Sequence, residues 1–394
     1  MKVLFLRWSG YGMEDMIEAF KECGLDVMIE EFPHKADGRH NSEYEDYLES
    51  VVRKEKPDFL FTFNYFPVIS LVAKKTDTKA VFWVYDSPYV MLYSYTIIFP
   101  QNYVFIFDKE QYFEFHKNGI NTVYYLPLAA NPKRQGSFPK ADEFKASKAY
   151  NRTDIAFVGA MYREKHQFFN RMEHISDYTR GYLEGIMASQ MKVYGYNFIR
   201  ELMTEKIMDD MHKDLPMETD PEGVETKEYL YAQYVINREI TGREREALLK
   251  KVGEKYKFDL YTNDESFTMP NCINHGRIDN YSVAPYVYNR AKINLNFTLR
   301  SITTGIPYRA FEVMASRGFL LTNYQADFDD CYVAGEDYVY FDSEDDLMAK
   351  IEYYLTHEEE RAEIARNGYE RTLNDHTYVH RIKEILNVVF NEGE

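Results

Sequence analysis

An unbroken apolar run, Val81-Phe82-Trp83-Val84, forms most of a predicted strand over residues 80–85. Continuous apolar runs are typical of strands that are covered on both faces of a sheet. Similar runs occur at 3–6, 26–30, 59–63, 103–107 and 122–126, and helical patterns at 13–23, 44–54, 68–74 and 109–117 lie between them. Strands that alternate with helices form βαβ units, so the sequence predicts a mainly parallel sheet in an α/β domain.

A second α/β domain is predicted after a change in composition. Residues 133–153 contain Gly136, Pro139 and several Lys, Ser and Asn residues, which is typical of a linker. Further strands are expected at 154–158, 258–261, 292–297, 319–322 and 338–341, and the helical stretch at about 163–255 is interpreted as an insert. We therefore expect an N-terminal domain over 1–132, a C-terminal domain over 154–377 and a last helix in 378–394. Two such domains would leave a cleft for a substrate in two parts.

The charge of the chain excludes several classes of partner. The 394 residues include 47 Lys and Arg against 64 Asp and Glu, which gives a formal net charge of −17. An acidic protein lacks the basic surface that binds nucleic acid or anionic lipid. The three cysteines are far apart and fit a reducing compartment, and no apolar run has the length of a signal peptide core or a membrane span. We expect a cytoplasmic protein without an integral membrane segment.

The segment most informative for function runs from 295 to 312. A predicted buried strand leads into a polar loop and then into a helix opened by Pro307, and proline is favoured in the first turn of a helix. The free N–H groups between Thr304 and Tyr308, with Gly305 beside them, could hold a phosphate.

Arg309 and Glu312 follow in this helix, three residues apart on one face. A carboxylate can accept two hydrogen bonds from the vicinal diol of a ribose. The alternative is that the two side chains only pair with each other, as side chains at this spacing commonly do.

A second candidate segment follows the predicted strand 154–158. Gly159 at the end of a strand allows close approach of a ligand to the backbone. Arg163 and Lys165 could neutralise a diphosphate, for which the guanidinium offers two-pronged contact. The alternative is an ordinary strand-to-helix turn with solvated charges.

Two loops of the N-terminal domain could line the cleft. Ser9, Gly10 and Gly12 follow the first strand but lack the third glycine of a dinucleotide fingerprint, so a tight loop on the acceptor side is the better interpretation. Asp86 follows the strand 80–85, where a catalytic carboxylate would lie. The alternative is that Asp86 initiates the turn Asp86-Ser87-Pro88.

No metal or cofactor is expected. The sequence contains no H-E-x-x-H element, no Walker loop and no kinase signature. One Asp-x-Asp occurs, Asp327-Phe328-Asp329, and we interpret it as a solvated acidic turn.

Several motifs resemble the group 1 glycosyltransferase domain of CgeB-like, spore-maturation-type proteins. Residues 305–312 read Gly-Ile-Pro-Tyr-Arg-Ala-Phe-Glu, residues 318–325 read Gly-Phe-Leu-Leu-Thr-Asn-Tyr-Gln, and residues 364–369 precede His376-Thr377-Tyr378 and Arg381. Residues 86–88 and 126–132 are similar to the domain often fused ahead of it. The resemblance covers most of the chain except the helical insert.

This resemblance implies a GT-B architecture, with two Rossmann-like domains facing each other across a cleft. The donor nucleotide sugar would bind the C-terminal domain and the acceptor mostly the N-terminal one. The last helix would cross back onto the N-terminal domain. The resemblance favours retention of the anomeric configuration, and we expect the activity to need no metal ion.

The resemblance also assigns residues. Glu312 corresponds to the second Glu of an E-x7-E element and would bind the ribose, whereas the first Glu is replaced by Thr304. Arg163 and Lys165 match the basic pair that binds the diphosphate. In the segment His275-Gly276-Arg277, Gly276 and Arg277 lie where the nucleobase is commonly held.

We therefore hypothesise a hexosyltransferase that moves a sugar from a nucleotide-sugar donor, UDP-linked rather than GDP-linked, to an unknown acceptor. Arg163, Lys165 and the helix N-terminus near Tyr308 would stabilise the leaving diphosphate. Two alternatives remain open. One is a nucleotide-sugar epimerase, and the other is a non-catalytic carbohydrate-binding protein, which the Thr304 substitution leaves open.

Overall fold

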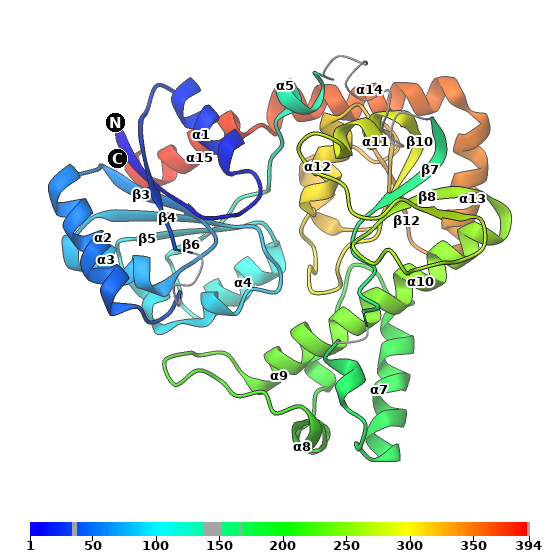
Figure 1. Ribbon diagram of the computed structural model, residues 1–394, viewed down its shortest axis with the longest axis horizontal. Coiled ribbons are helices and arrows are strands. Elements are labelled where there is room, and N and C mark those ends of the chain that lie inside the picture. Colours follow the sequence, from blue (N-terminus) through cyan, green and yellow to red (C-terminus); the bar gives the residue numbers. More distant parts are fainter. Residues whose placement is uncertain (34–37, 138–151, 165–166, 392–394) are drawn as a thin grey trace. The chain divides into compact units, whose positions relative to one another are not determined.

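The computed structural model of the chain describes residues 1–33, 38–137, 152–164 and 167–391. Lys165 and most of the predicted linker lie outside these described residues. The chain forms two compact units, each assembled from more than one segment (Figure 1). The first comprises Met1–Ala129, Thr219–Glu225 and Thr377–Glu394, and the second comprises Ala130–Glu218 and Thr226–His376.

The first unit is built on a parallel six-stranded sheet of order β2-β1-β3-β4-β5-β6. Its strands are β1 Lys2–Arg7, β2 Asp26–Glu31, β3 Phe59–Phe63, β4 Lys79–Val84, β5 Asn102–Ile106 and β6 Val123–Tyr125. Helices α2 Ser42–Glu55, α3 Pro67–Thr76 and α4 Lys109–Lys117 lie on one face, and α1 Met13–Glu22 and α15 Tyr378–Asn391 on the other (Figure 1). Covered on both faces, the strand β3 is buried along its whole length, as its apolar sequence predicts.

Side-chain caps explain where two of these helices begin. The side chain of Asn41 accepts a hydrogen bond from the backbone N–H of Tyr44 at the start of α2. Asp108 accepts from the backbone N–H groups of Glu110 and Gln111 at the start of α4. Each cap satisfies N–H groups that have no partner within the helix.

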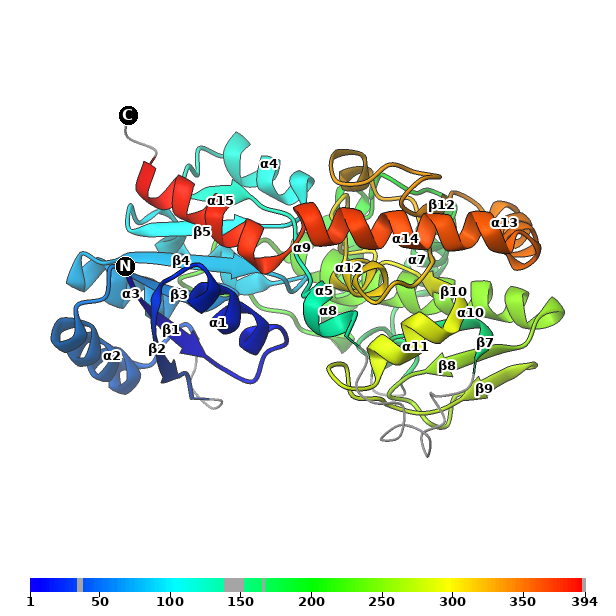
Figure 2. The same cartoon turned by 90° about the horizontal axis from the view of Figure 1, so that it is seen from above.

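Two segments of the first unit follow parts of the second unit in the sequence. Helix α15 packs against α1 (Figure 2), and its Phe390 ring lies 5.7 Å from that of Phe59 in β3. The segment Thr219–Glu225 is joined to the unit by a hydrogen bond from the N–H of Val224 to the carbonyl of Tyr93, at 2.7 Å. The first unit therefore depends on residues supplied from within the predicted insert and from the C-terminus.

The second unit is a second parallel six-stranded sheet, of order β12-β11-β10-β7-β8-β9. Its strands are β7 Thr153–Val158, β8 Phe258–Tyr261, β9 Cys272–Asn274, β10 Ala291–Asn296, β11 Leu320–Asn323 and β12 Val339–Phe341. Helix α13 Glu344–Thr356 packs on one face with the end of α10 Asn237–Lys255. Helices α11 Ala284–Arg290, α12 Tyr308–Ala315 and α14 Glu358–Asp375 form another group, in which α12 touches both others and the short α5 Pro132–Gln135.

The helical insert has a hydrophobic core of its own. The helices of the insert are α7 Asp177–Gln190, α8 Glu205–Asp214, α9 Lys227–Leu230, the π-helix Tyr231–Ile236 and α10. Leu183, Met187, Met211 and Tyr231 are fully or almost fully buried in this core. Among the described residues, none of the helices combines the length and the apolar character needed to cross a membrane.

Candidate functional site

In each unit the parallel strands end at one edge of the sheet, where α/β proteins bind ligands. In the second unit, Gly159 follows β7, and the polar loop of residues 297–306 follows β10 and leads to α12. Strands β7 and β10 are neighbours, with Phe157 opposite Leu295. This pairing places the two segments that the sequence selects next to each other.

Gly159 and Arg309, far apart in sequence, are in close contact. A Cβ built on Gly159 would lie 3.0 Å from Nη1 and 3.2 Å from Cζ of Arg309. This distance is below an ordinary van der Waals contact, so any larger residue at 159 would have to displace the guanidinium. The structure therefore brings together two of the residues predicted to bind a donor.

The side chains of Arg309, Glu312 and Tyr288 lie within one another's electrostatic influence. Glu312 is 6% exposed, and the Nε atom of Arg309 is buried with no hydrogen-bond partner among the described residues. Burial raises the pKa of Tyr288, the carboxylate of Glu312 raises it further, and Arg309 opposes the rise. The charges of Arg309 and Glu312, both in α12, thus meet at the buried phenol of Tyr288 in α11.

The loop before α12 is tied to the segment that follows β11. The carbonyl of Thr304 accepts from the N–H of Asp327 at 3.0 Å, and that of Gly305 accepts from Nε2 of Gln325 at 3.1 Å. Thr304 is 7% exposed, and Pro307 is the residue just before α12, with Tyr308 as its first helical residue. The backbone at Thr304 and Gly305 is therefore held in place before the helix begins.

The expectation of a solvated turn at 327–329 is wrong for Asp327. Residues Ala326–Asp330 form a 3₁₀ helix that buries Asp327, at 1% exposure, and leaves Asp329 exposed. The reason is the backbone hydrogen bond to Thr304, which draws this end of the short helix against the loop before α12.

Arg163 is already neutralised by protein carboxylates. Its Nη1 lies 3.0 Å from Oε1 of Glu239, and its Nε lies 2.8 Å from Oε2 of Glu246, both in α10. The neighbouring Tyr162 has a left-handed φ of 53° and packs on Gly242 of α10, where an added Cβ would lie 2.5 Å from the Tyr162 carbonyl oxygen. The role of Arg163 at a diphosphate stays a prediction, and Lys165 lies outside the described residues.

Arg245 is a buried cation that the sequence did not single out. It donates hydrogen bonds to the carbonyls of Ala160 and Phe297, so it joins the loops that follow β7 and β10. Burial, together with the charge of the nearby Arg309, lowers the pKa of Arg245 to about 10, although Tyr162 and Glu244 oppose the change. Its sequence context, a run of alternating Arg and Glu in a helix, has no local signal that distinguishes Arg245 from the half-buried Arg243.

The proposed base-binding residues follow the edge strand β9. Gly276 has a φ of 73°, which favours glycine, and its N–H donates to Oδ1 of Asn274 at 3.0 Å. Arg277 is exposed. The preceding His275 stacks on Tyr261 at 4.6 Å and bonds Oδ1 of Asp259 at 3.0 Å. Strands β7 and β8 separate this position from β10, so the two ends of the predicted donor site lie along one sheet edge.

In the first unit, Asp86 is held by a residue that the sequence analysis missed. Nδ2 of Asn64 donates to Oδ2 of Asp86 at 2.7 Å, and Oδ1 of Asn64 accepts from the N–H groups of Tyr85 and Asp86. Desolvation raises the pKa of Asp86, and the Asn64 hydrogen bond opposes the rise. Asn64 has a φ of 61°, a conformation that asparagine tolerates better than most residues.

The predicted acceptor loop lies at the same edge of the first sheet. The ring of Trp8 stacks on Tyr85 at 6.2 Å, and a Cβ on Gly10 would lie 3.0 Å from the Trp8 ring. Gly12 has a φ of 79° and would bring a Cβ within 2.6 Å of the hydroxyl of Tyr378 in α15. Ser9 precedes this turn. The loop and Asp86 thus meet around Tyr85, which follows β4.

Comparison with known proteins agrees with this architecture. Residues 240–387 match a protein family described as Glycosyl transferase-like. A search of curated proteins finds no match to the sequence.

Several solved structures share the fold over nearly the whole chain. A glycosyltransferase from Rickettsia africae ESF-5 is 11% identical, with a TM-score of 0.54, and covers 99% of this chain and 98% of its own. Sucrose-phosphate synthase from Thermosynechococcus elongatus is 11% identical, with a TM-score of 0.53 and full coverage of both chains (100% each). HepE from Anabaena, in complex with UDP-glucose, is 8% identical, with a TM-score of 0.55, and covers 99% of this chain and 100% of its own.

At these identities the likeness concerns the fold alone. The predicted fold class is confirmed: the chain has the GT-B fold of two Rossmann-like α/β domains, and over residues 240–387 its sequence resembles the Glycosyl transferase-like family.

Proposed function

We propose that the chain is a glycosyltransferase that takes its sugar from a nucleotide-sugar donor. The observation that carries this proposal is the contact of Gly159 with Arg309 at the start of α12, beside the buried Glu312. All but Gly159 of these residues lie in the segment that resembles the Glycosyl transferase-like family. HepE, which has the same fold, is seen with UDP-glucose, and this supports a UDP-linked sugar as the donor.

Arg309 is the best-placed cation for the diphosphate. Its buried Nε has no hydrogen-bond partner among the described residues, and a buried charged donor without a partner is costly. A diphosphate oxygen would satisfy it. In contrast, Arg163 already contacts two carboxylates, so in this proposal it supports the loop after β7 and meets the ligand secondarily.

The remaining donor contacts follow from the same loop. The N–H groups near Thr304, Gly305 and Tyr308 would add hydrogen bonds to the phosphate oxygens. The carboxylate of Glu312 would accept from the two ribose hydroxyls. Gly276 and Arg277 would hold the base further along the sheet edge.

In the reaction, the bond between the anomeric carbon of the sugar and the diphosphate oxygen breaks, and a bond from that carbon to the oxygen of an acceptor hydroxyl forms. The proton of this hydroxyl passes to the departing diphosphate. Negative charge develops on the diphosphate, which Arg309 and the N–H groups before α12 would stabilise without a metal ion. Asp86, beside the loop of Ser9, Gly10 and Gly12, would be a catalytic carboxylate on the acceptor side. We further propose that the reaction retains the anomeric configuration and that the transferred sugar is a hexose. We also propose that the chain belongs to the CgeB-like subtype.

Metal independence gives the first prediction. Because fixed cationic and N–H groups replace the metal, UDP should bind with the same dissociation constant in EDTA and in millimolar Mg²⁺. Isothermal titration calorimetry with UDP, and with GDP as the comparison nucleotide, measures this. Binding of UDP only in the presence of Mg²⁺ would contradict the proposed chemistry.

A second prediction concerns the ribose. Glu312→Gln should raise the dissociation constant of UDP about tenfold, because a neutral amide oxygen accepts hydrogen bonds more weakly than a carboxylate. The 2′-deoxy analogue dUDP should lose less affinity from this substitution than UDP, because it lacks one of the two hydroxyls. Equal losses for both nucleotides would remove Glu312 from the ribose site.

The Thr304 substitution keeps one alternative in view, a protein that binds a nucleotide sugar without turning it over. Incubation of the protein with UDP-glucose, with and without a pool of sugar acceptors, distinguishes a glycosyltransferase from such a binding protein. Release of UDP that depends on an acceptor supports transfer, whereas binding without any UDP release supports the non-catalytic protein. Formation of an isomeric nucleotide sugar without an acceptor would indicate an epimerase.

A further inference from the structure

We infer that the helical insert positions the donor loop, residues 297–306, through Arg300 and its partner Glu244. This inference rests on the proposed function, because that loop leads to the N–H groups assigned to the diphosphate. It gives the insert a role in the same site without direct contact to the ligand.

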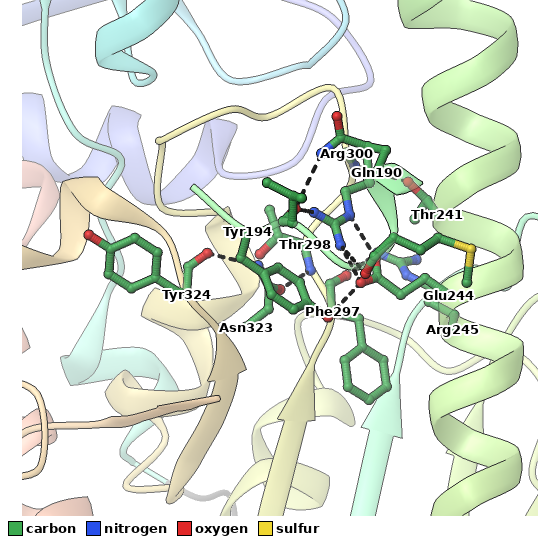
Figure 3. A network of polar contacts seen from close by, with 12 residues as sticks. Gln190, Tyr194, Thr241, Glu244, Arg245, Phe297, Thr298, Arg300, Asn323 and Tyr324 are labelled. Carbon is green, nitrogen blue, oxygen red and sulfur yellow. Dashed lines mark hydrogen bonds and ion pairs between the residues drawn. The ribbon is translucent and has the colours of Figure 1, made fainter. Parts of the chain in front are cut away.

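Each nitrogen of the Arg300 guanidinium contacts another group of the protein (Figure 3). Its Nε donates to Oε2 of Glu244 at 2.8 Å, its Nη2 lies against Oε1 of the same carboxylate, and its Nη1 donates to the carbonyl of Val193 at 2.8 Å. Arg300 is 8% exposed and Glu244 is 4% exposed. A guanidinium bound in this way is not available to a ligand, so Arg300 is a positioning residue.

The backbone of Arg300 is held by the same elements. Its N–H donates to Oγ1 of Thr241 in α10 at 2.9 Å, and its carbonyl accepts from Nδ2 of Asn197 at 2.8 Å. Both peptide groups of the residue are therefore fixed, which restricts the path of the donor loop on either side of it.

Tyr194 completes the network. Its hydroxyl donates to Oε1 of Glu244 at 2.6 Å, and the guanidinium of Arg300 lies over its ring at 4.4 Å. Burial works against the charge of Arg300, but the carboxylate of Glu244 outweighs it and raises the pKa of Arg300. Arg300 therefore keeps its positive charge in this network.

The segment that carries Tyr194 also touches the neighbouring strand end. Gly195, with a φ of 77°, approaches Tyr324 so closely that a Cβ would lie 3.1 Å from the ring. Tyr324 follows Asn323, whose Oδ1 accepts from the N–H of Thr298 in the donor loop at 2.7 Å. The insert thus contacts the donor loop directly at Arg300. It also contacts Tyr324, which follows the residue that bonds the loop at Thr298.

Helix α10, which supplies Thr241 and Glu244, is anchored in two hydrophobic cores. Ile240 belongs to the core of the insert, whereas Leu248, Leu249 and Val252 of the same helix belong to the core beneath the sheet. Thr241 and Glu244 lie between these two sets. A side chain anchored there is fixed to both cores, so the donor loop keeps its position relative to the sheet.

The test uses a matched pair of tyrosines in the insert. Tyr194→Phe removes the hydroxyl that bonds Glu244, whereas Tyr182→Phe removes a hydroxyl that bonds the carbonyl of Leu202 at 2.8 Å. Thr241→Val is a second variant of nearly unchanged volume, which takes away the partner of the Arg300 N–H. Amide hydrogen exchange of residues 298–306 is measured in each variant of the full chain, together with the binding of UDP and of uridine.

We expect Thr241→Val to speed exchange in the donor loop about tenfold and Tyr194→Phe severalfold, with little change in the sheet strands. The dissociation constant of UDP should rise by a similar factor, while that of uridine stays constant, because uridine lacks the diphosphate. The Tyr182→Phe control should match the wild type in both measurements. A merely structural role would lower the affinities for UDP and uridine together.

Unchanged exchange in the donor loop of both variants would overturn the inference, as would equal losses for UDP and uridine. If the wild-type protein binds no UDP, the proposed function fails. Loop exchange in the same samples then still decides whether the insert holds the loop.

Discussion

Arg309→Ala is expected to weaken the binding of UDP about 100-fold. Hydrogen bonds to a charged group contribute roughly 1.5–3 kcal/mol each, and a tenfold change in affinity corresponds to about 1.4 kcal/mol. The guanidinium lies against Gly159, and its buried Nε has no hydrogen-bond partner among the described residues, so its removal costs ligand contacts. Within the protein the substitution also removes the contact with Tyr288. Calorimetry with UDP measures the loss.

Uridine and a second arginine provide the controls. The affinity for uridine should stay within about twofold in Arg309→Ala, since the substitution removes a diphosphate contact. Arg317, just beyond the end of α12, is exposed and lies over the ring of Tyr369. Arg317→Ala should therefore leave UDP binding unchanged. Loss of uridine binding together with UDP binding in Arg309→Ala would show that the residue supports the fold and not the diphosphate.

Gly242→Ala is expected to lower the free energy of unfolding by about 1–2 kcal/mol, even though alanine is a better helix former by about 1 kcal/mol. The new Cβ would lie 2.5 Å from the carbonyl oxygen of Tyr162, a backbone atom that cannot rotate away. Either α10 or the loop after β7 has to shift. Thermal or urea unfolding measures the effect.

Gly185, in α7, is the matched control. It is also a helical glycine, but an added Cβ there meets nothing within 4 Å. Gly185→Ala should therefore raise the free energy of unfolding by about 0.5–1 kcal/mol, through helix propensity and the lower entropy of the unfolded chain. Stabilisation by both substitutions would show that the loop at Tyr162 adapts without cost.

Most of the fold could be predicted because its strands are covered on both faces. Unbroken apolar runs and helical patterns between them gave β3 Phe59–Phe63, α4 Lys109–Lys117 and β8 Phe258–Tyr261 with the bounds that the structure shows. Strand β9, Cys272–Asn274, was not predicted. It has three residues at the edge of its sheet, and its central Ile273 is exposed, so no apolar run marks it.

The candidate site was predictable only where a residue type itself suggests chemistry. Gly159 and Arg309 were both selected from their own segments, but their contact depends on the pairing of β7 with β10, which local sequence does not encode. Arg245, Arg300 and Asn64 were missed for the same reason. Each acts through groups distant in sequence, and nothing nearby separates it from an ordinary surface or turn residue.

The composition of the first unit has a consequence for how the protein is made. Residues 1–129 are synthesised first, yet the unit also contains Thr219–Glu225 and α15, which ends at Asn391. The face of the first sheet that α15 covers stays open on the ribosome until residues 378–391 have emerged. The second unit precedes α15 in the sequence, so the first unit can complete its fold only after the second unit has been synthesised.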